Sequence, residues 1–197
     1  MIYSLSHPRS GANWLRYCVE YLTHRPTSFL YGSLDWDPPI YTLCDNITIT
    51  DKKIILKYGH KMAPSFLKQE DKLIFLLRDY KKSAFSNLIR TYPKSFNWAN
   101  VKFELDYYLN SLQIYDKFVG DKILIRYEDL ISGKSLDDII KFMGFDIDVT
   151  TFLLEIDSHQ QKSMSVYRDG KLKNKKIYDL TSWDEYMEKN ILYEKYF

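Results

Sequence analysis

Short apolar runs alternate with longer stretches of helical periodicity along this chain. Runs typical of buried strands cover 2–5, 53–57, 73–77 and 122–125. Stretches with apolar residues spaced along one helical face cover 12–23, 80–91, 98–118, 135–143, 149–157 and 183–195. This alternation predicts an α/β fold over residues 1–197, a single domain with a central parallel sheet flanked by helices.

Several charged or reactive residues follow the predicted strands closely. Arg9, His60, Arg78 and Tyr127 each come at or shortly after a strand end. The carboxyl ends of parallel strands meet at one edge of a sheet, and ligands bind in the crevice there. We therefore expect these four residues at the same edge of the sheet.

The loop between the first strand and the first helix has a pattern that favours phosphate binding. Residues 7–11 form a polar turn with Pro and Gly, and a helical pattern starts at Ala12. A helix N-terminus presents free backbone N–H groups and the positive end of its dipole. Arg9 adds a full positive charge, and Gly11 lets the backbone approach an anion closely. The sequence thus predicts a P-loop-like phosphate site.

Four segments carry a resemblance to a known family. The first, Pro8-Arg9-Ser10-Gly11-Ala12-Asn13-Trp14, resembles the 5′-phosphosulfate loop of the sulfotransferase family, which reads Pro-Lys/Arg-Ser-Gly-x-Thr-Trp. The others follow in the family's order. They are Arg78 at a strand end with Ser86 eight residues on, a strand ending in Tyr127-Glu128-Asp129-Leu130, and Arg168-Asp169-Gly170, similar to the family's late Arg-Lys-Gly loop.

The resemblance implies a fold, a donor and a reaction. The donor would be 3′-phosphoadenosine 5′-phosphosulfate (PAPS) and the product 3′,5′-bisphosphoadenosine (PAP). Separately, no His, Cys or Asp cluster in the sequence has metal-ligand spacing, so we expect the reaction to need no divalent ion. The sulfuryl group would pass to a hydroxyl or amine of a small-molecule or glycan acceptor. The implied donor-binding residues are Arg9, Ser10, Gly11, Ala12, Asn13, Trp14, Arg78, Ser86, Tyr127, Arg168, Asp169 and Gly170.

Within that set the resemblance assigns individual roles. Trp14 would stack on adenine, Tyr127 would approach the adenine edge, and Arg78, Ser86 and Arg168 would hold the 3′-phosphate. Arg9 would stabilise charge on the bridging oxygen, and its role is electrostatic because a guanidinium does not release its proton at neutral pH.

A histidine is the expected general base, since an imidazole takes up protons near neutrality. The family places a His shortly after a Lys at the end of its second conserved strand, and Lys57-Tyr58-Gly59-His60 matches with one residue extra. His60 is therefore the predicted base, and His7 in the phosphate loop is the alternative.

The chain also departs from the family pattern. Asn13 stands where a hydroxyl is usual, Asp169 where Lys is common, and His159 near a position that is often aromatic beside adenine. These departures keep open a non-catalytic nucleotide-binding protein on the same scaffold. A P-loop kinase or nucleoside triphosphatase is disfavoured, because the Walker A pattern Gly-x4-Gly-Lys-Ser/Thr is missing.

Composition adds bounds to these expectations. The net charge of +2 gives no field that favours nucleic acid, and the two cysteines, Cys18 and Cys44, have no metal-like spacing. No N-terminal signal and no apolar run long enough to span a membrane are visible, so we expect a cytoplasmic protein.

Two segments are expected outside the regular elements. Residues 24–50 hold three prolines and several aromatics with little periodicity, which predicts an irregular insert, either a lid or a surface meander. Residues 158–176 are expected to close over the donor.

Overall fold

The computed structural model of the protein describes residues 1–30, 38–60, 62–91, 97–165, 181–189 and 195–196. Arg168, Asp169 and Gly170, with much of the expected closing segment 158–176, lie outside the described residues.

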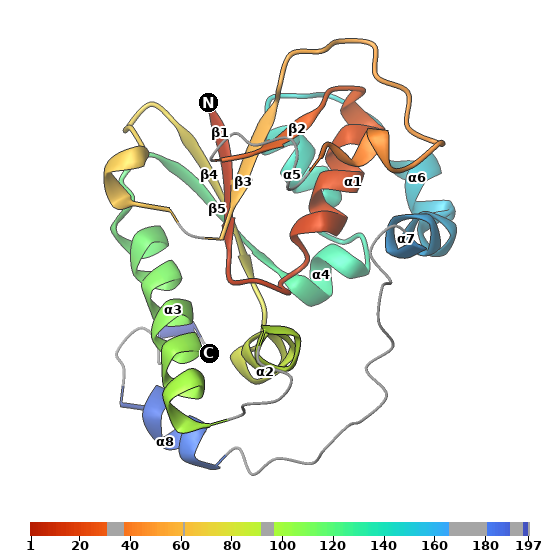
Figure 1. The fold of residues 1–197 in the computed structure, drawn as a ribbon. Coiled ribbons are helices and arrows are strands. Elements are labelled where there is room, and N and C mark those ends of the chain that lie inside the picture. The colour runs from red at the N-terminus through yellow and green to blue at the C-terminus, as the bar shows by residue number, and fades with distance from the viewer. Residues whose placement is uncertain (31–37, 61, 92–96, 166–180, 190–194, 197) are drawn as a thin grey trace.

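Five parallel strands form one sheet in the order β2-β3-β1-β4-β5 (Figure 1). The predicted α/β fold with a central parallel sheet is therefore confirmed. The strands are β1 (Ile2–Ser6), β2 (Thr27–Phe29), β3 (Leu56–Gly59), β4 (Lys72–Leu77) and β5 (Asp121–Arg126).

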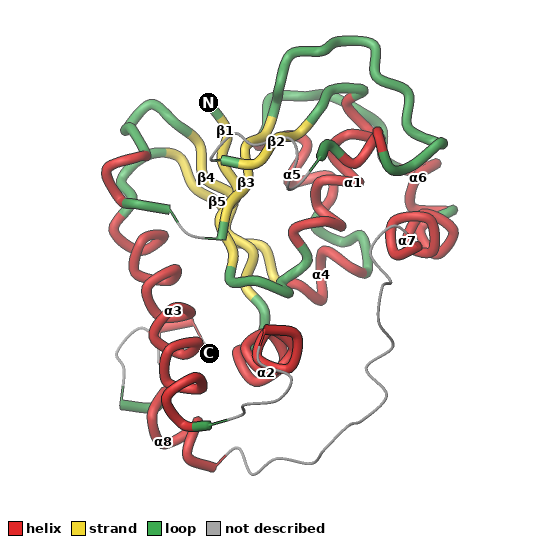
Figure 2. Tube along the Cα trace, in the orientation of Figure 1, coloured by secondary structure: helices red, strands yellow, loops and turns green. Residues whose placement is uncertain are grey.

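Helices cover both faces of the sheet because successive strand residues point to opposite sides. In β1, Ile2 packs into one apolar cluster, whereas Tyr3 and Leu5 pack into the other. Figures 1 and 2 show the two helical layers. The first layer holds α1 (Ala12–Thr23), α4 (Tyr127–Ile131), α5 (Leu136–Phe142), α6 (Thr150–Leu154) and α7 (Ile156–Ser165), and the second holds α2 (Tyr80–Thr91), α3 (Trp98–Lys117) and α8 (Thr181–Met187).

The predicted helices at 12–23 and 80–91 agree with α1 and α2 to the residue. Two predicted helices are wrong in extent. The one expected at 149–157 is the separate helices α6 and α7, and the one expected at 183–195 is α8, which ends at Met187. Helix ends carry weak sequence signals, since they depend on which side chains cap them.

Residues 24–50 are not wholly irregular, which corrects the prediction. They contain β2 at the edge of the sheet and a 3₁₀ turn, η1 (Ile40–Thr42), and a second such turn, η2 (Pro64–Phe66), precedes β4. The third strand also lies later than predicted, at 56–59 instead of 53–57. Both cysteines, Cys18 and Cys44, are buried free thiols.

A buried polar network on α1 explains why the segment after it is ordered. Glu20 is fully buried and accepts hydrogen bonds from the backbone N–H groups of Thr27 (2.9 Å), Ile40 (3.3 Å) and Tyr41 (2.7 Å), and from the Thr27 hydroxyl. Burial raises the pKa of Glu20, and the hydrogen bonds from Thr27 and Tyr41 oppose that rise. One carboxylate thus holds both β2 and η1 against α1.

Arg16, one turn before Glu20, completes this network. It is also fully buried, donates to the Thr27 hydroxyl (3.0 Å) and the Pro38 carbonyl (2.7 Å), and lies 4.1 Å over the Tyr58 ring. Helical spacing therefore places two charged side chains where they bind one inserted segment.

Replacing the Glu20 carboxylate by an amide should destabilise the fold. In Glu20→Gln the NH₂ group faces backbone donors, so we expect a loss of about 2–3 kcal/mol in the free energy of unfolding. Urea denaturation measures it. The exposed Glu70→Gln should change stability by less than about 0.5 kcal/mol. Equal effects of the two substitutions would contradict this account of the network.

Candidate active site

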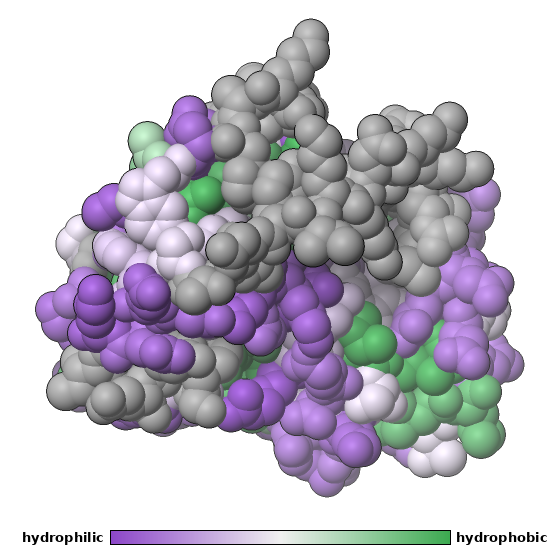
Figure 3. Space-filling model, turned by 90° about the horizontal axis from the view of Figure 1, so that it is seen from below, coloured by the Kyte–Doolittle hydropathy of each residue, from purple (hydrophilic) through white to green (hydrophobic). Residues whose placement is uncertain are grey.

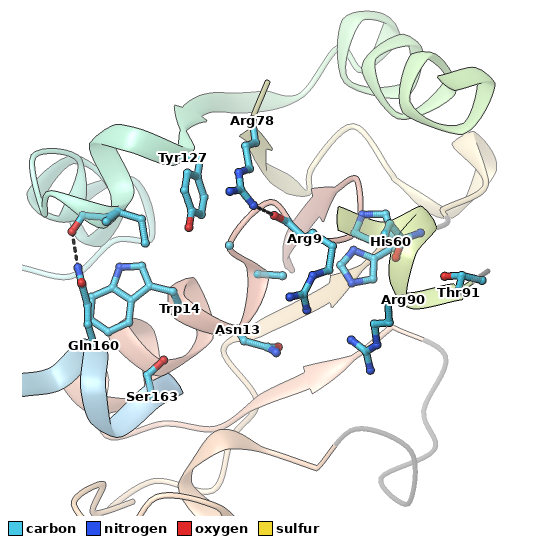
Figure 4. A pocket seen from close by; sticks show the side chains of 15 residues that line it. Arg9, Asn13, Trp14, His60, Arg78, Arg90, Thr91, Tyr127, Gln160 and Ser163 are labelled. Atoms are coloured by element: carbon cyan, nitrogen blue, oxygen red, sulfur yellow. Dashed lines mark hydrogen bonds between the residues drawn. The ribbon is translucent and has the colours of Figure 1, made fainter. Parts of the chain in front are cut away.

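A cavity of about 500 Å³ lies at the carboxyl edge of the sheet (Figure 4). Arg9, His60, Arg78 and Tyr127, which follow β1, β3, β4 and β5, all line it. The four residues expected at one edge of the sheet therefore meet there. Seen from that edge, hydrophilic side chains cover much of the coloured surface (Figure 3).

The loop after β1 turns sharply into the N-terminus of α1. Arg9 has φ 70°, which is uncommon outside glycine, and Gly11 has φ 94°. Gly11, Ala12 and Asn13 line the cavity, no side chain caps α1 at its start, and no acid lies in its first turn. The first-turn N–H groups lack intrahelical partners, so an anion in the cavity could accept from them.

Gly11 is required here for space as well as for conformation. A Cβ on this residue would lie 3.0 Å from Cδ2 of the Tyr127 ring. The absence of a side chain therefore lets Tyr127 pack directly on the loop and form the cavity wall above it.

Arg78 connects the loop to the centre of the sheet. Its Nη1 donates to the Arg9 carbonyl (2.5 Å), its guanidinium lies 4.1 Å over the Tyr127 ring, and its own carbonyl accepts from the Tyr108 hydroxyl (2.5 Å). Its Nε is buried without a hydrogen-bond partner. A charged donor is thus held rigidly with one N–H unsatisfied.

Arg9 lies between other cations. Its Nε donates to Ser86 Oγ (3.2 Å). Partial desolvation lowers the pKa of Arg9, and the positive charges of Arg90 and Arg78 lower it further. Ser10 is fully buried and its hydroxyl has no partner. Among the described residues that line the cavity, none is acidic.

The unsatisfied donors and clustered arginines at the loop after β1 favour an anionic group in the cavity. Buried donors without acceptors cost free energy, and clustered arginines repel one another. A phosphate or sulfate supplies acceptor oxygens to the buried donors and negative charge to the clustered arginines. The donor set at the loop therefore fits the anionic ends of a nucleotide.

His60 lies in the cavity with one ring nitrogen fixed. Its Nδ1 is 3.1 Å from the Ser6 carbonyl and 3.3 Å from the Ser6 hydroxyl. A carbonyl can only accept, so this pattern assigns the proton to Nδ1 and leaves Nε2 as the basic nitrogen.

His7 lies beneath the loop, outside the residues that line the cavity. Only 1% of it is exposed, its Nδ1 donates to the Pro8 carbonyl (2.9 Å), and its Nε2 is 3.0 Å from Glu104 Oε2. The same carboxylate oxygen accepts from Asn87 (2.9 Å). This buried contact ties the loop to α3 and α2.

Trp14 combines a core position with a face on the cavity. Its Nε1 donates to the Leu130 carbonyl (3.0 Å), and its ring stacks on Tyr17 at 5.5 Å between centroids. Only 5% of it is exposed, yet it lines the cavity. A nucleobase bound at this end of the cavity would therefore contact the one accessible side of the fixed Trp14 ring.

Some cavity residues were not predicted from the sequence. Asn87, Arg90 and Thr91 follow the predicted Ser86 by one, four and five positions on α2, so helical spacing could have found them. Gln160 and Ser163 on α7 belong to the segment 158–176 that was expected to close over the donor, but no motif singled out these two residues.

His159 does not line this cavity, although its place in the sequence predicted a position near adenine. It is 1% exposed, stacks on Phe152 (4.2 Å between centroids), and its Nδ1 lies 2.9 Å from the Tyr17 hydroxyl. It borders a separate cavity of about 380 Å³. Burial lowers the pKa of His159, and the charge of Lys162 lowers it further.

That shift predicts a pH dependence of stability. Above about pH 6.5 His159 is neutral in both states, and as the pH falls below it the unfolded chain takes up the proton first. The folded state should therefore lose stability as the pH falls from about 6.5 to 5.5, and His159→Gln should lose less. The urea concentration at the midpoint of unfolding, determined at several pH values for the wild type and the variant, measures this loss. The exposed His24→Gln should keep the wild-type decrease. An identical acid response in His159→Gln would contradict the prediction.

Two further properties concern the described residues as a whole. No group of three or more His, Cys, Asp or Glu side chains in that part of the chain is arranged to hold a metal ion. None of the helices described there combines the length and apolarity needed to cross a membrane.

Solved structures with the same architecture include two sulfotransferases. The sulfotransferase domain of the Synechococcus PCC 7002 olefin synthase is 15% identical, with a TM-score of 0.55, and the match covers 88% of this chain and 78% of that one. Mouse sulfotransferase SULT7A1, solved in complex with PAP, is 18% identical, with a TM-score of 0.52, over 89% of this chain and 67% of that one.

No family model matches the sequence, and no curated protein matches it. The structural likeness nevertheless extends over most of the chain. The protein therefore has the fold of sulfotransferase domains.

Proposed function

We propose that the protein is a sulfotransferase that moves a sulfuryl group from PAPS to a hydroxyl or amine. The fold supports this, as does the PAP bound to the mouse neighbour. The observation that carries the proposal is the meeting of Arg9, Arg78 and Ser86 at the N-terminus of α1, with buried donors that lack acceptors.

The anionic groups of the donor would be shared between two sets of residues. The N–H groups of 10–13 and the dipole of α1 would bind the 5′-phosphosulfate, while Arg78 and Ser86 would bind the 3′-phosphate. By the sequence resemblance, Arg168, Asp169 and Gly170 would complete that second set. The faces of Trp14 and Tyr127 would border the adenine.

Transfer would proceed by in-line displacement. The acceptor oxygen or nitrogen forms a bond to sulfur as the bond from sulfur to the 5′-phosphate oxygen breaks. His60 Nε2 would take the acceptor's proton, and Arg9 would stabilise the charge that develops on the departing oxygen. Orientation of the two reactants can supply about 7–11 kcal/mol of the barrier. No metal ion has a role in this scheme.

The 3′-phosphate provides the test of the donor site. PAP should raise the melting temperature strongly, whereas AMP and ATP with Mg²⁺ should raise it little, because only PAP offers the group that Arg78 would bind. Arg78→Ala should weaken PAP binding about ten- to hundredfold, and it should weaken AMP binding less, because AMP loses only the support that Arg78 gives to the Arg9 loop. Calorimetric titration measures both.

The matched control is Arg25→Ala, which removes an arginine paired with Asp51 outside the cavity. It should bind PAP like the wild type. Preferential binding of ATP with Mg²⁺, or no binding of PAP, would overturn the proposed function.

Removal of the His60 imidazole should separate binding from turnover. His60→Ala should bind PAP normally and lose about 10²–10⁴-fold in turnover with labelled PAPS and a panel of phenol, sugar and amine acceptors. The pH dependence of the rate should also change, because the proton acceptor is lost. Unchanged turnover and pH profile would remove His60 from this role and leave His7 as the alternative base. PAP binding without turnover of any acceptor by the wild type would favour the non-catalytic nucleotide-binding protein.

A further inference from the structure

The cavity has two ends of different chemistry. Trp14, Gln160 and Ser163 lie at one end, and Arg90 and Thr91 lie at the other, on the far side of Arg9 (Figure 4). If the donor's adenine occupies the Trp14 end, as in the proposed function, the other end lies beyond the reacting sulfur. His60 belongs to that second end, and the base must contact the acceptor.

Arg90 is placed there by the face that α2 presents. Ser86, Asn87, Arg90 and Thr91 share one side of the helix, while Leu88 on another side is fully buried in the core. Ser86 contacts Arg9, and Asn87 is anchored to Glu104 (2.9 Å). These two contacts hold α2, so Arg90 projects from a supported helix into the cavity.

The charge of Arg90 is not compensated within the described part of the chain. It makes no hydrogen bond or ion pair there, and none of the described cavity residues is acidic. Its charge acts on Arg9 strongly enough to lower the pKa of that group more than Arg78 does. An exposed cation near a second cation favours binding of an anion between or beside them.

We propose that Arg90 selects acceptors that carry an anionic group, a carboxylate or a sulfate ester, close to the hydroxyl or amine that is sulfated. This inference rests on the proposed function, because it takes the acceptor to lie at the His60 end. A guanidinium binds a carboxylate or sulfate through two parallel N–H donors, which orients as well as attracts.

The experiment compares acceptors that differ only in charge. The pairs are methyl glucuronide with methyl glucoside, and 4-hydroxybenzoate with 4-hydroxybenzamide, each assayed with labelled PAPS. The wild type should favour the acid of each pair by about tenfold or more in kcat/KM. Arg90→Gln should abolish that preference through KM, Arg90→Lys should keep most of it, and Arg25→Gln should behave as wild type.

Two binding measurements accompany the assay. Arg90→Gln should bind PAP as tightly as the wild type, and a loss like that of Arg78→Ala would make Arg90 a donor ligand and overturn the inference. With PAP saturating, 4-hydroxybenzoate should raise the melting temperature more than 4-hydroxybenzamide. If neither acid is bound or turned over better than its neutral partner, the inference is wrong even though PAP binds. Failure of PAP to bind the wild type would instead refute the proposed function.

Discussion

The hydrogen bond from Arg78 to the Arg9 carbonyl is the contact on which the cavity depends. Arg9 has a positive φ, a conformation that a residue with a side chain adopts at a cost and keeps only where other contacts hold it. Arg78 supplies that contact from the end of β4, and the Tyr127 ring supports the guanidinium. Arg78, which would bind the 3′-phosphate, therefore also fixes the conformation of the loop that would bind the 5′-phosphosulfate.

Buried polar contacts support this loop from below and order the neighbouring insert. His7, Glu104 and Asn87 connect the loop to α3 and α2, while Glu20 holds the segment after α1. Networks of this kind contribute modest net stability, but they tolerate few alternative arrangements, because any shift leaves buried donors without acceptors. The geometry of the cavity is thus determined by interactions that lie outside it, and the side chains that face the cavity remain available for ligand.

The electrostatic character of the cavity links its two proposed halves. Arg9, Arg78 and Arg90 lie in one cavity whose described lining has no acid, and the rings of Trp14 and Tyr127 form part of its wall. Charges interact more strongly in a cleft bordered by protein than on an open surface, so a highly charged nucleotide gains more here. The same surplus of positive charge extends past His60, where the acceptor would lie.

Local features of the sequence determined β1, the loop and α1, because strand alternation, the Gly11 turn and helical spacing all involve neighbours along the chain. The same local signals predicted the strand ends at which Arg9, His60, Arg78 and Tyr127 meet. They could not predict β2, since a three-residue strand has no measurable period and is held by Glu20 and β3. The burial of His159 was likewise decided by the tertiary structure, because it depends on a contact with Tyr17, which lies far away in sequence, and spacing along the chain carries no information about such a contact.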